Sequence, residues 1–134
     1  MKRILWAVLG VALTTAGCAD PVAPTTPTPA LPTITDSYTD TLLVGGSNRH
    51  DFTVAAIGGV TITVPSVAPS ASVGIGIGTP SLGTCSLLDR AQTVAGNTAV
   101  LSGTATVPGT YCVLIFDLGN LVEPAVYTIN VLHS

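Results

Sequence analysis

The sequence predicts an all-β protein that folds as a single β-sandwich or jelly-roll-like domain of seven to eight short antiparallel strands. Charged residues make up only 8% of the chain, and Gly, Pro, Thr, Ser, Ala and Val dominate it, which favours strands and tight turns over helices. Apolar residues alternate with threonine or glycine in several short runs, as in strands with one buried face. Turn-forming residues separate these runs at the spacing that a sandwich requires.

Residues 1–17 have the pattern of a signal peptide that directs export. A positively charged start precedes an apolar run at residues 4–13, which is too short to cross a bilayer core, since about 20 helical residues are needed. The small residues before Cys18 resemble the end of a bacterial lipobox, although Thr15 stands where leucine is usual. We therefore predict that Cys18 is lipidated and anchors the chain to the membrane. Ordinary cleavage after Ala19, which gives a freely secreted protein, stays open.

Residues 18–35 combine the cysteine that would bear the lipid with a linker rich in proline and threonine. Proline removes backbone N–H donors and favours extended polyproline conformations. The linker is therefore expected to be a semi-rigid spacer that holds a folded domain, residues 36–134, away from the membrane surface.

The first half of this domain contains four predicted strands. They cover residues 38–44, 52–56, 60–64 and 73–78. Residues 45–48 form a turn after the first strand, and Pro65 is expected to end the third. In the fourth strand, Gly74, Gly76 and Gly78 alternate with apolar residues. Their spacing does not match a nucleotide-binding loop, so we expect this bare face to lie close under another segment.

The second half holds the densest apolar run. One strand is expected at residues 100–107, with Gly103 as a candidate bulge. Residues 111–118 are apolar on both faces apart from Asp117, which is typical of a strand buried on both sides. Residues 126–132 alternate, so one face of that strand should be buried and the other wet. The polar residues 117–123 are expected to form a hairpin loop between the last two strands.

The charge of the exported part excludes nucleic-acid binding. From residue 18 onward, Arg49 and Arg90 are the only arginines or lysines and face seven carboxylates, a net charge of −5. A protein that binds nucleic acid needs lysines and arginines to displace the counterions of the phosphates.

The cysteine count predicts one structural disulfide. Three cysteines are present, and lipidation of Cys18 or its removal leaves Cys85 and Cys112 as a pair. An exported domain enters an oxidising compartment, where such a pair forms a disulfide. In the chain-entropy model a loop of this length stabilises the fold by about 3.5 kcal/mol. The sequence has no Cys-x-x-Cys spacing and no histidine near these cysteines, so it does not indicate a metal site.

The sequence contains no convincing catalytic constellation. His50 and Asp51 are neighbours, and Ser47 lies close to them in the sequence, but a Gly-x-Ser-x-Gly elbow is absent. We interpret the three residues as a polar turn before the second strand. The other histidine, His133, is next to last in the chain and is expected to be exposed.

No metal or cofactor is predicted. The acidic residues are scattered singly, without the spacing of a calcium-binding loop. Asp36 and Asp40, beside the first strand, are the weak candidates for a hard cation. Threonines recur on the expected wet faces and are interpreted as strand formers that keep an uncharged surface soluble, not as a saccharide-binding array. They are Thr61, Thr63, Thr104, Thr106 and Thr128.

Six short stretches resemble one known family. They are residues 41–47, 51–54, 60–64, 109–111, 117–119 and 127–131. Together they are similar to the bacterial pre-peptidase C-terminal domain, a small β-sandwich of secreted and surface proteins. The resemblance implies a non-catalytic module; some members bind calcium or matrix protein. This chain lacks the acidic cluster of the calcium-binding members and has no catalytic domain beside the sandwich.

The sequence therefore predicts a lipid-anchored, non-catalytic binding or accessory module at the bacterial cell envelope, in the periplasm or on the cell surface. Its ligand would be a protein or a polysaccharide, presented to the loops 66–72, 79–90 and 119–124. The alternative is a freely secreted or self-associating structural domain. A hydrolase that uses Ser47, His50 and Asp51 ranks third.

Overall fold

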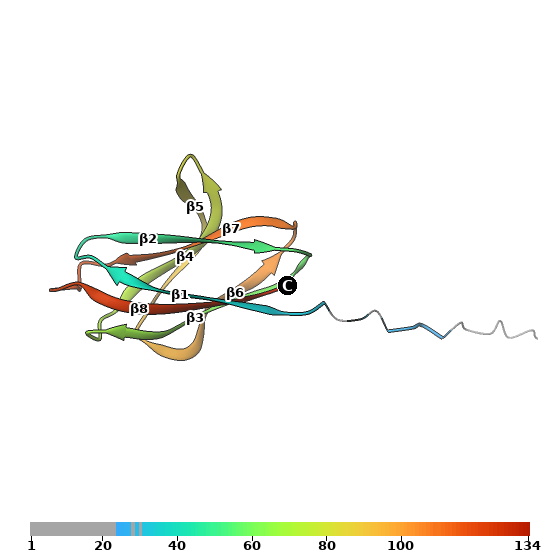
Figure 1. Cartoon of the computed structure of the whole chain (residues 1–134), viewed down its shortest axis with the longest axis horizontal. Coiled ribbons are helices and arrows are strands. Elements are labelled where there is room, and N and C mark those ends of the chain that lie inside the picture. Colours follow the sequence, from blue (N-terminus) through green and yellow to red (C-terminus); the bar gives the residue numbers. More distant parts are fainter. Residues whose placement is uncertain (1–23, 28, 30) are drawn as a thin grey trace, which may run out of the picture.

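The computed structural model describes residues 24–27, 29 and 31–134, and it confirms the predicted fold class. The predicted signal peptide, Cys18 and much of the predicted linker lie outside the described residues. Eight strands form the domain (Figure 1): β1 (Ile34–Leu42), β2 (Ser47–Val54), β3 (Gly58–Ala68), β4 (Val73–Ser81), β5 (Thr84–Thr93), β6 (Gly96–Ala105), β7 (Gly109–Asp117) and β8 (Ala125–His133). No helix in this part of the chain has the length and apolar character needed to span a membrane.

The strands form two four-stranded antiparallel sheets that pack face to face as a sandwich. One sheet has the order β1-β8-β3-β6 and the other β2-β7-β4-β5. The edge strands β1 and β2 adjoin along one side of the sandwich, and the edge strands β5 and β6 adjoin along the other. We call these the β1–β2 side and the β5–β6 side.

Alternation along each strand places apolar side chains between the sheets. In β8, Tyr127, Ile129 and Val131 are fully buried, whereas the side chains between them are at least partly exposed, as predicted. In β7, Val113 and Ile115 are buried in the same core. The outer face of β7 is also largely covered, which agrees with the predicted strand that is apolar on both faces.

The predicted hairpin between the last two strands is wrong. β7 is a central strand of one sheet and β8 a central strand of the other, so residues 118–124 cross between the sheets. Both strands carry an apolar face, and in the sandwich these faces pack against each other across the core. Hydrophobic pattern does not distinguish this arrangement from edge-to-edge pairing, because both bury the same residues.

Several strand boundaries differ from the predicted ones. β1 begins at Ile34, because its first residues pair with the end of β8, so the last two residues of the predicted linker lie in a strand. β3 continues through Pro65 to Ala68, because a register shift between Thr63 and Ser66 accommodates the proline, which has no N–H to donate. Gly103 pairs regularly with Val60 and is not a bulge; the irregularity of β6 lies before Leu101.

Residues 79–90, expected to be the least regular segment, form the end of β4, a tight turn and the first part of β5. The sequence pattern did not predict this hairpin, because most side chains of β5 are exposed and so leave no regular alternation of apolar and polar residues. The bare face of β4 does lie under neighbouring groups, as predicted. A Cβ on Gly74 would meet the ring of Phe116, and one on Gly78 would meet the backbone of Ser86.

Candidate functional site

The β1–β2 side is closed by a cluster of aromatic and polar side chains around His50. The ring of His50 stacks on Tyr38, with centroids 4.6 Å apart, and its Nε2 lies 2.7 Å from the hydroxyl of Tyr127. The Tyr38 hydroxyl donates a hydrogen bond to the backbone oxygen of Asp51 at 2.9 Å. Burial lowers the pKa of His50, against the opposing effect of Asp40 and Asp51. Burial therefore favours the neutral form of His50, which serves as a packing partner.

The structure does not bring Ser47, His50 and Asp51 together as a catalytic group. All three belong to β2, not to the predicted turn, and alternation along that strand turns His50 toward the core and the other two outward. Asp51 is instead held by Arg49 through two hydrogen bonds, of 2.7 Å from Nε and 2.6 Å from Nη2. These bonds lower the pKa of Asp51. The three residues are close in the sequence but are not arranged as a catalytic group.

His133 is buried, with 2% of its surface exposed, and the predicted exposure is wrong. Its Nε2 lies 3.0 Å from a carboxylate oxygen of Asp36, and its ring packs 5.3 Å from that of Phe52. The end of the chain is fixed because the N–H of Ala55 donates to the backbone oxygen of Ser134 at 3.0 Å. Position near a terminus therefore did not predict exposure.

The acidic residues organise the backbone and do not gather as metal ligands. Asp117 accepts hydrogen bonds from the backbone N–H groups of Gly45 and Gly119, each at 2.8 Å, and of Asn120 at 2.9 Å. These bonds lower its pKa. Within residues 24–27, 29 and 31–134, no three His, Cys, Asp or Glu side chains are placed to hold a metal ion, and Asp36 is bonded to His133.

The buried polar side chains of this part of the chain are thus engaged within the fold. No buried side-chain nitrogen or oxygen of the described residues lacks a hydrogen-bond partner. Buried polar atoms without a partner often mark functional sites, and the described residues offer none. The exposed apolar features of the described residues are the remaining candidates for a site.

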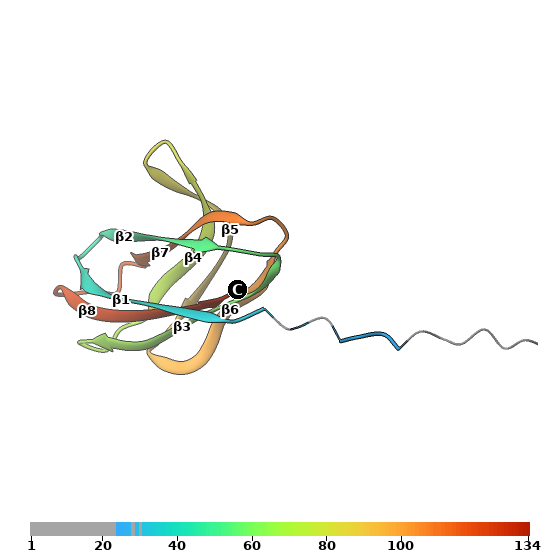
Figure 2. The same ribbon diagram turned by 45° about the vertical axis from the view of Figure 1, so that its right-hand side comes forward.

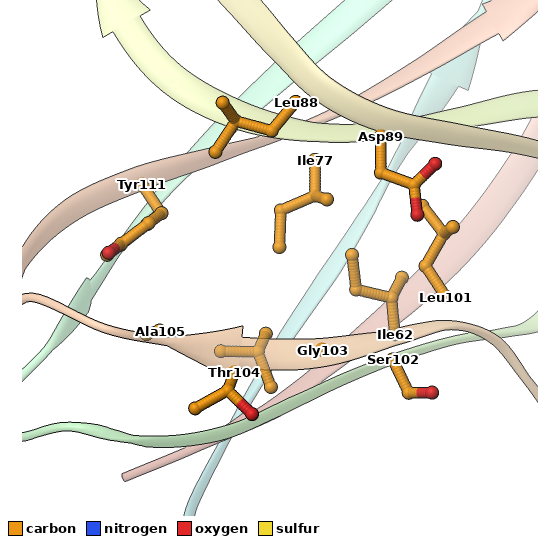
Figure 3. Close-up of a pocket in the computed structure, with 11 residues that line it drawn as sticks. Ile62, Ile77, Leu88, Asp89, Leu101, Ser102, Gly103, Thr104, Ala105 and Tyr111 are labelled. Carbon is orange, nitrogen blue, oxygen red and sulfur yellow. The ribbon is translucent and has the colours of Figure 1, made fainter.

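The most enclosed and most apolar of these features in the described residues is a groove on the β5–β6 side (Figure 3). It is a cavity of about 180 Å³ between the two sheets, open to solvent. Its lining is mostly apolar, and Asp89 is its one charged residue. The lining consists of Val60, Ile62, Ile77, Leu88, Asp89, Leu101, Ser102, Gly103, Thr104, Ala105 and Tyr111. We call this the β5–β6 groove.

A bulge in β5 exposes Leu88 at the groove. Asp89 pairs with Ile77 and Leu87 pairs with Gly78, so Leu88 between them has no partner on β4. An extra residue of this kind bends the strand and redirects a side chain. Leu88 lies with Ile77 on one side of the cavity, facing Ile62 on the other (Figure 3). Leu88 remains 70% exposed, so a partner that fills the groove would bury it.

The size of the groove limits what it can hold. An apolar cavity of roughly 150 Å³ accepts one benzene-sized molecule, whereas pockets for drug-sized ligands span about 300–1,000 Å³. At about 180 Å³, the groove fits a single aromatic or branched aliphatic side chain. An extended saccharide would need hydrogen-bonding groups for its hydroxyls, and the lining offers few.

The sequence placed this site only in part. Leu88 falls in segment 79–90, one of the three predicted ligand-presenting segments, while residues 66–72 and 119–124 contribute nothing to the groove. Of the threonines predicted on wet faces, Thr104 lines the groove, and Thr128 is bonded to Thr39 on the outer face of β8. The bulge at Leu88 was missed because register shifts depend on pairing partners.

A scan against protein-family models and a search of curated proteins gave no match to the chain. Among solved structures, the chain is similar to PliG of Aeromonas hydrophila, a periplasmic lysozyme inhibitor of g-type lysozyme. The match covers 72% of this chain and 83% of PliG, with a TM-score of 0.51 and 10% sequence identity. At this identity the likeness concerns the fold.

Proposed function

We propose that this protein is an exported, non-catalytic module of the bacterial cell envelope that binds a protein partner at the β5–β6 groove. The observation that carries the proposal is the open apolar cavity with Leu88 at its edge, which fits one side chain of a partner. Interfaces often take most of their binding energy from such an anchor side chain in a desolvated pocket.

Two further observations support this proposal. The structure joins Cys85 to Cys112 by a disulfide, with Cα atoms 5.9 Å apart, and disulfides are typical of exported proteins. The similar fold of PliG belongs to a periplasmic protein that inhibits a protein, so a sandwich of this type can serve in protein binding. The proposed kinship with pre-peptidase C-terminal domains agrees with the same role.

We also propose that Cys18 carries the lipid that holds the module at the membrane, with residues 18–35 as a spacer. The intact mass of the mature protein, measured unreduced from separate membrane and soluble fractions of its host, tests this. A membrane species that starts at Cys18 and carries acyl groups is the expected result. A soluble species that starts at Asp20 would contradict the anchor.

Site-specific photo-crosslinking in the host tests the groove. A photoreactive phenylalanine analogue at Thr104, on the groove, is compared with the same analogue at Thr39, an exposed threonine on the outer face of β1. We expect a discrete protein adduct from position 104 that is absent from position 39 and is lost in the Leu88→Ser variant. Equal adducts from both positions, or no protein adduct from position 104, would refute the proposal.

A self-associating structural domain is the second candidate, because a groove with an exposed leucine can also receive another copy of the chain. In that case the adduct from position 104 has twice the mass of the protein and contains no other chain. Sedimentation of the mature chain would then show a concentration-dependent dimer that Leu88→Ser abolishes. A strictly monomeric protein at high concentration would exclude this candidate.

A further inference from the structure

The turn between β4 and β5 projects from the sandwich and ends in an exposed leucine. Both views of the molecule show this turn standing away from the two sheets (Figures 1 and 2). Leu82 forms its end and is fully exposed, with a relative accessibility of 102%. Residues 79–88 around it contain no charged side chain. We call residues 81–84 the hairpin tip.

The backbone of the tip is unfavourable for a leucine. Leu82 has φ = +47° and Gly83 has φ = +80°, as in the two central residues of a type I′ turn. Glycine, asparagine and aspartate are the residues that usually occupy such positions, because a larger side chain crowds the backbone there. Leu82 is the only described non-glycine residue with a positive φ. A strained residue that buries nothing in its own fold indicates a role at the surface.

Two interactions fix the tip to the outer face of its sheet, and a third closes the turn itself. The disulfide connects Cys85, next to the tip, to Cys112 on β7. Arg49 on β2, itself held by Asp51, donates a hydrogen bond from Nη1 to the backbone oxygen of Thr84 at 2.9 Å. Thr84 in turn donates from its hydroxyl to the backbone oxygen of Ser81 at 2.7 Å. The tip is therefore held in place by these contacts although it is exposed.

These interactions add little to the core. No side chain of β5 is fully buried, and Ala91 is its one hydrophobic residue packed against the core, so the disulfide and the Arg49–Asp51 pair hold an element that contributes little to the core. Their effect is to fix the position of Leu82. A preorganised loop loses less conformational freedom on binding than a flexible one, which increases affinity.

We propose that the hairpin tip is a second binding element, which inserts Leu82 into an apolar pocket of a partner protein. The tip is convex and would enter a concave pocket of its partner. At the β5–β6 groove the roles are reversed, because there this protein provides the concave surface. A protein fits this tip better than a membrane surface, because residues 79–88 offer no lysine or arginine for lipid headgroups and the exported part carries a charge of −5. The tip and the groove use different residues.

The Leu82→Asn variant separates binding from folding. Asparagine tolerates the left-handed conformation, so the melting temperature of the variant should be equal to or higher than that of the wild type. Loss of a central anchor side chain typically weakens an interface by about 30-fold or more. A stable variant that no longer binds therefore locates the function in the side chain of Leu82.

Photo-crosslinking in the host provides the measurement. The photoreactive phenylalanine analogue is placed at Ser81, and the control position is Val122, an apolar residue that is 94% exposed in the loop between β7 and β8. We expect a protein adduct at position 81 that Leu82→Asn abolishes and that is absent at position 122. An adduct that survives Leu82→Asn, an adduct with lipid alone, or none at position 81 would overturn the proposal. The adduct at position 104 is scored in parallel, so failure of the tip is distinguishable from failure of the groove.

Discussion

The gap between the two sheets is closed on one side of the sandwich and open on the other. On the β1–β2 side, His50 and Tyr38 stack and His50 meets the hydroxyl of Tyr127, so side chains of both sheets close the gap. On the β5–β6 side the gap stays open as a cavity of about 180 Å³, with Leu88 exposed beside it. Groups on the closed side have their partners inside the molecule. This difference supports the proposal that a partner binds on the open side.

The disulfide gives a physical reason for the open side. Cys112 lies on the outer face of β7, because its neighbour Val113 points into the core. The disulfide therefore ties the start of β5 to the outer face of its sheet, away from β6. The bulge at Leu88 bends β5 further along. One strand thus has its tip held outward while its bulged residue lies at the groove.

The largest expected effect is on the closed side, from Tyr127→Ala. Tyr127 is fully buried, and truncation of a large aromatic side chain in a core costs about 3–5 kcal/mol of unfolding free energy. Urea unfolding measures the change. Tyr127→Phe is the matched control, with an expected loss of about 1 kcal/mol for the hydrogen bond alone. A loss below about 1 kcal/mol for Tyr127→Ala would contradict the structural role of this side.

The second effect concerns the disulfide, which holds β5, the strand that carries both the hairpin tip and the bulge at the β5–β6 groove. Replacing Cys85 and Cys112 together by serine should lower the unfolding free energy by about 3.5 kcal/mol. Hydrogen exchange should also become faster at residues 79–88 than in β8, because the tip loses its tie to β7. Exchange at residues 79–88 that accelerates no more than in β8 would show that the disulfide acts only through the stability of the whole fold and does not hold the tip in particular.

The third effect is a pH dependence specific to the closed side. Burial lowers the pKa of His50 below its ordinary value of 6.5, so the unfolded chain takes up a proton at a higher pH than the folded chain does. The stabilising contribution is therefore complete above pH 6.5 and is lost as the pH falls below it. Unfolding free energies between pH 7.5 and 5 measure the slope.

His50→Gln should remove that slope. The lowered pKa values of Asp51 and Asp117 act in another range, since their contribution is lost only as the pH falls through and below 3.8. Measurements above pH 5 keep the two effects apart. An unchanged slope in His50→Gln would mean that another group titrates in this range.

The smallest effect on stability is expected on the open side. Leu88→Ser changes a residue that is 70% exposed and has no partner on β4, so its unfolding free energy should change by no more than about 0.5 kcal/mol. Thermal unfolding beside the wild type measures this. A loss of 2 kcal/mol or more would show that Leu88 belongs to the core and would weaken its assignment to a binding site.

The fold was predictable where burial alternates along a strand. The pattern of β8 predicted its buried face, with Tyr127, Ile129 and Val131 inside, because period-two alternation follows directly from strand geometry. The glycines of β4 predicted a closely covered face for a similar reason, since a missing side chain leaves room for a neighbour. Local spacing was sufficient in both strands.

The candidate site depends on features that the local pattern does not contain. Leu88 faces the groove because β5 slips by one residue against β4, and Leu82 is strained because of the turn that joins them. His133 is buried because β1 pairs with the end of β8, about a hundred residues away in the sequence. Each feature is set by which strands become neighbours, so it becomes visible only in the folded chain.

The most direct test compares binding of the partner recovered by crosslinking to two matched variants. Leu88→Ser alters the open side, and Leu132→Ser alters an exposed leucine of β8 that lies away from the groove. We predict that Leu88→Ser weakens binding by about tenfold or more, the equivalent of roughly 1.4 kcal/mol, while Leu132→Ser leaves it unchanged. Equal affinity of the two variants would contradict the assignment of binding to the β5–β6 side.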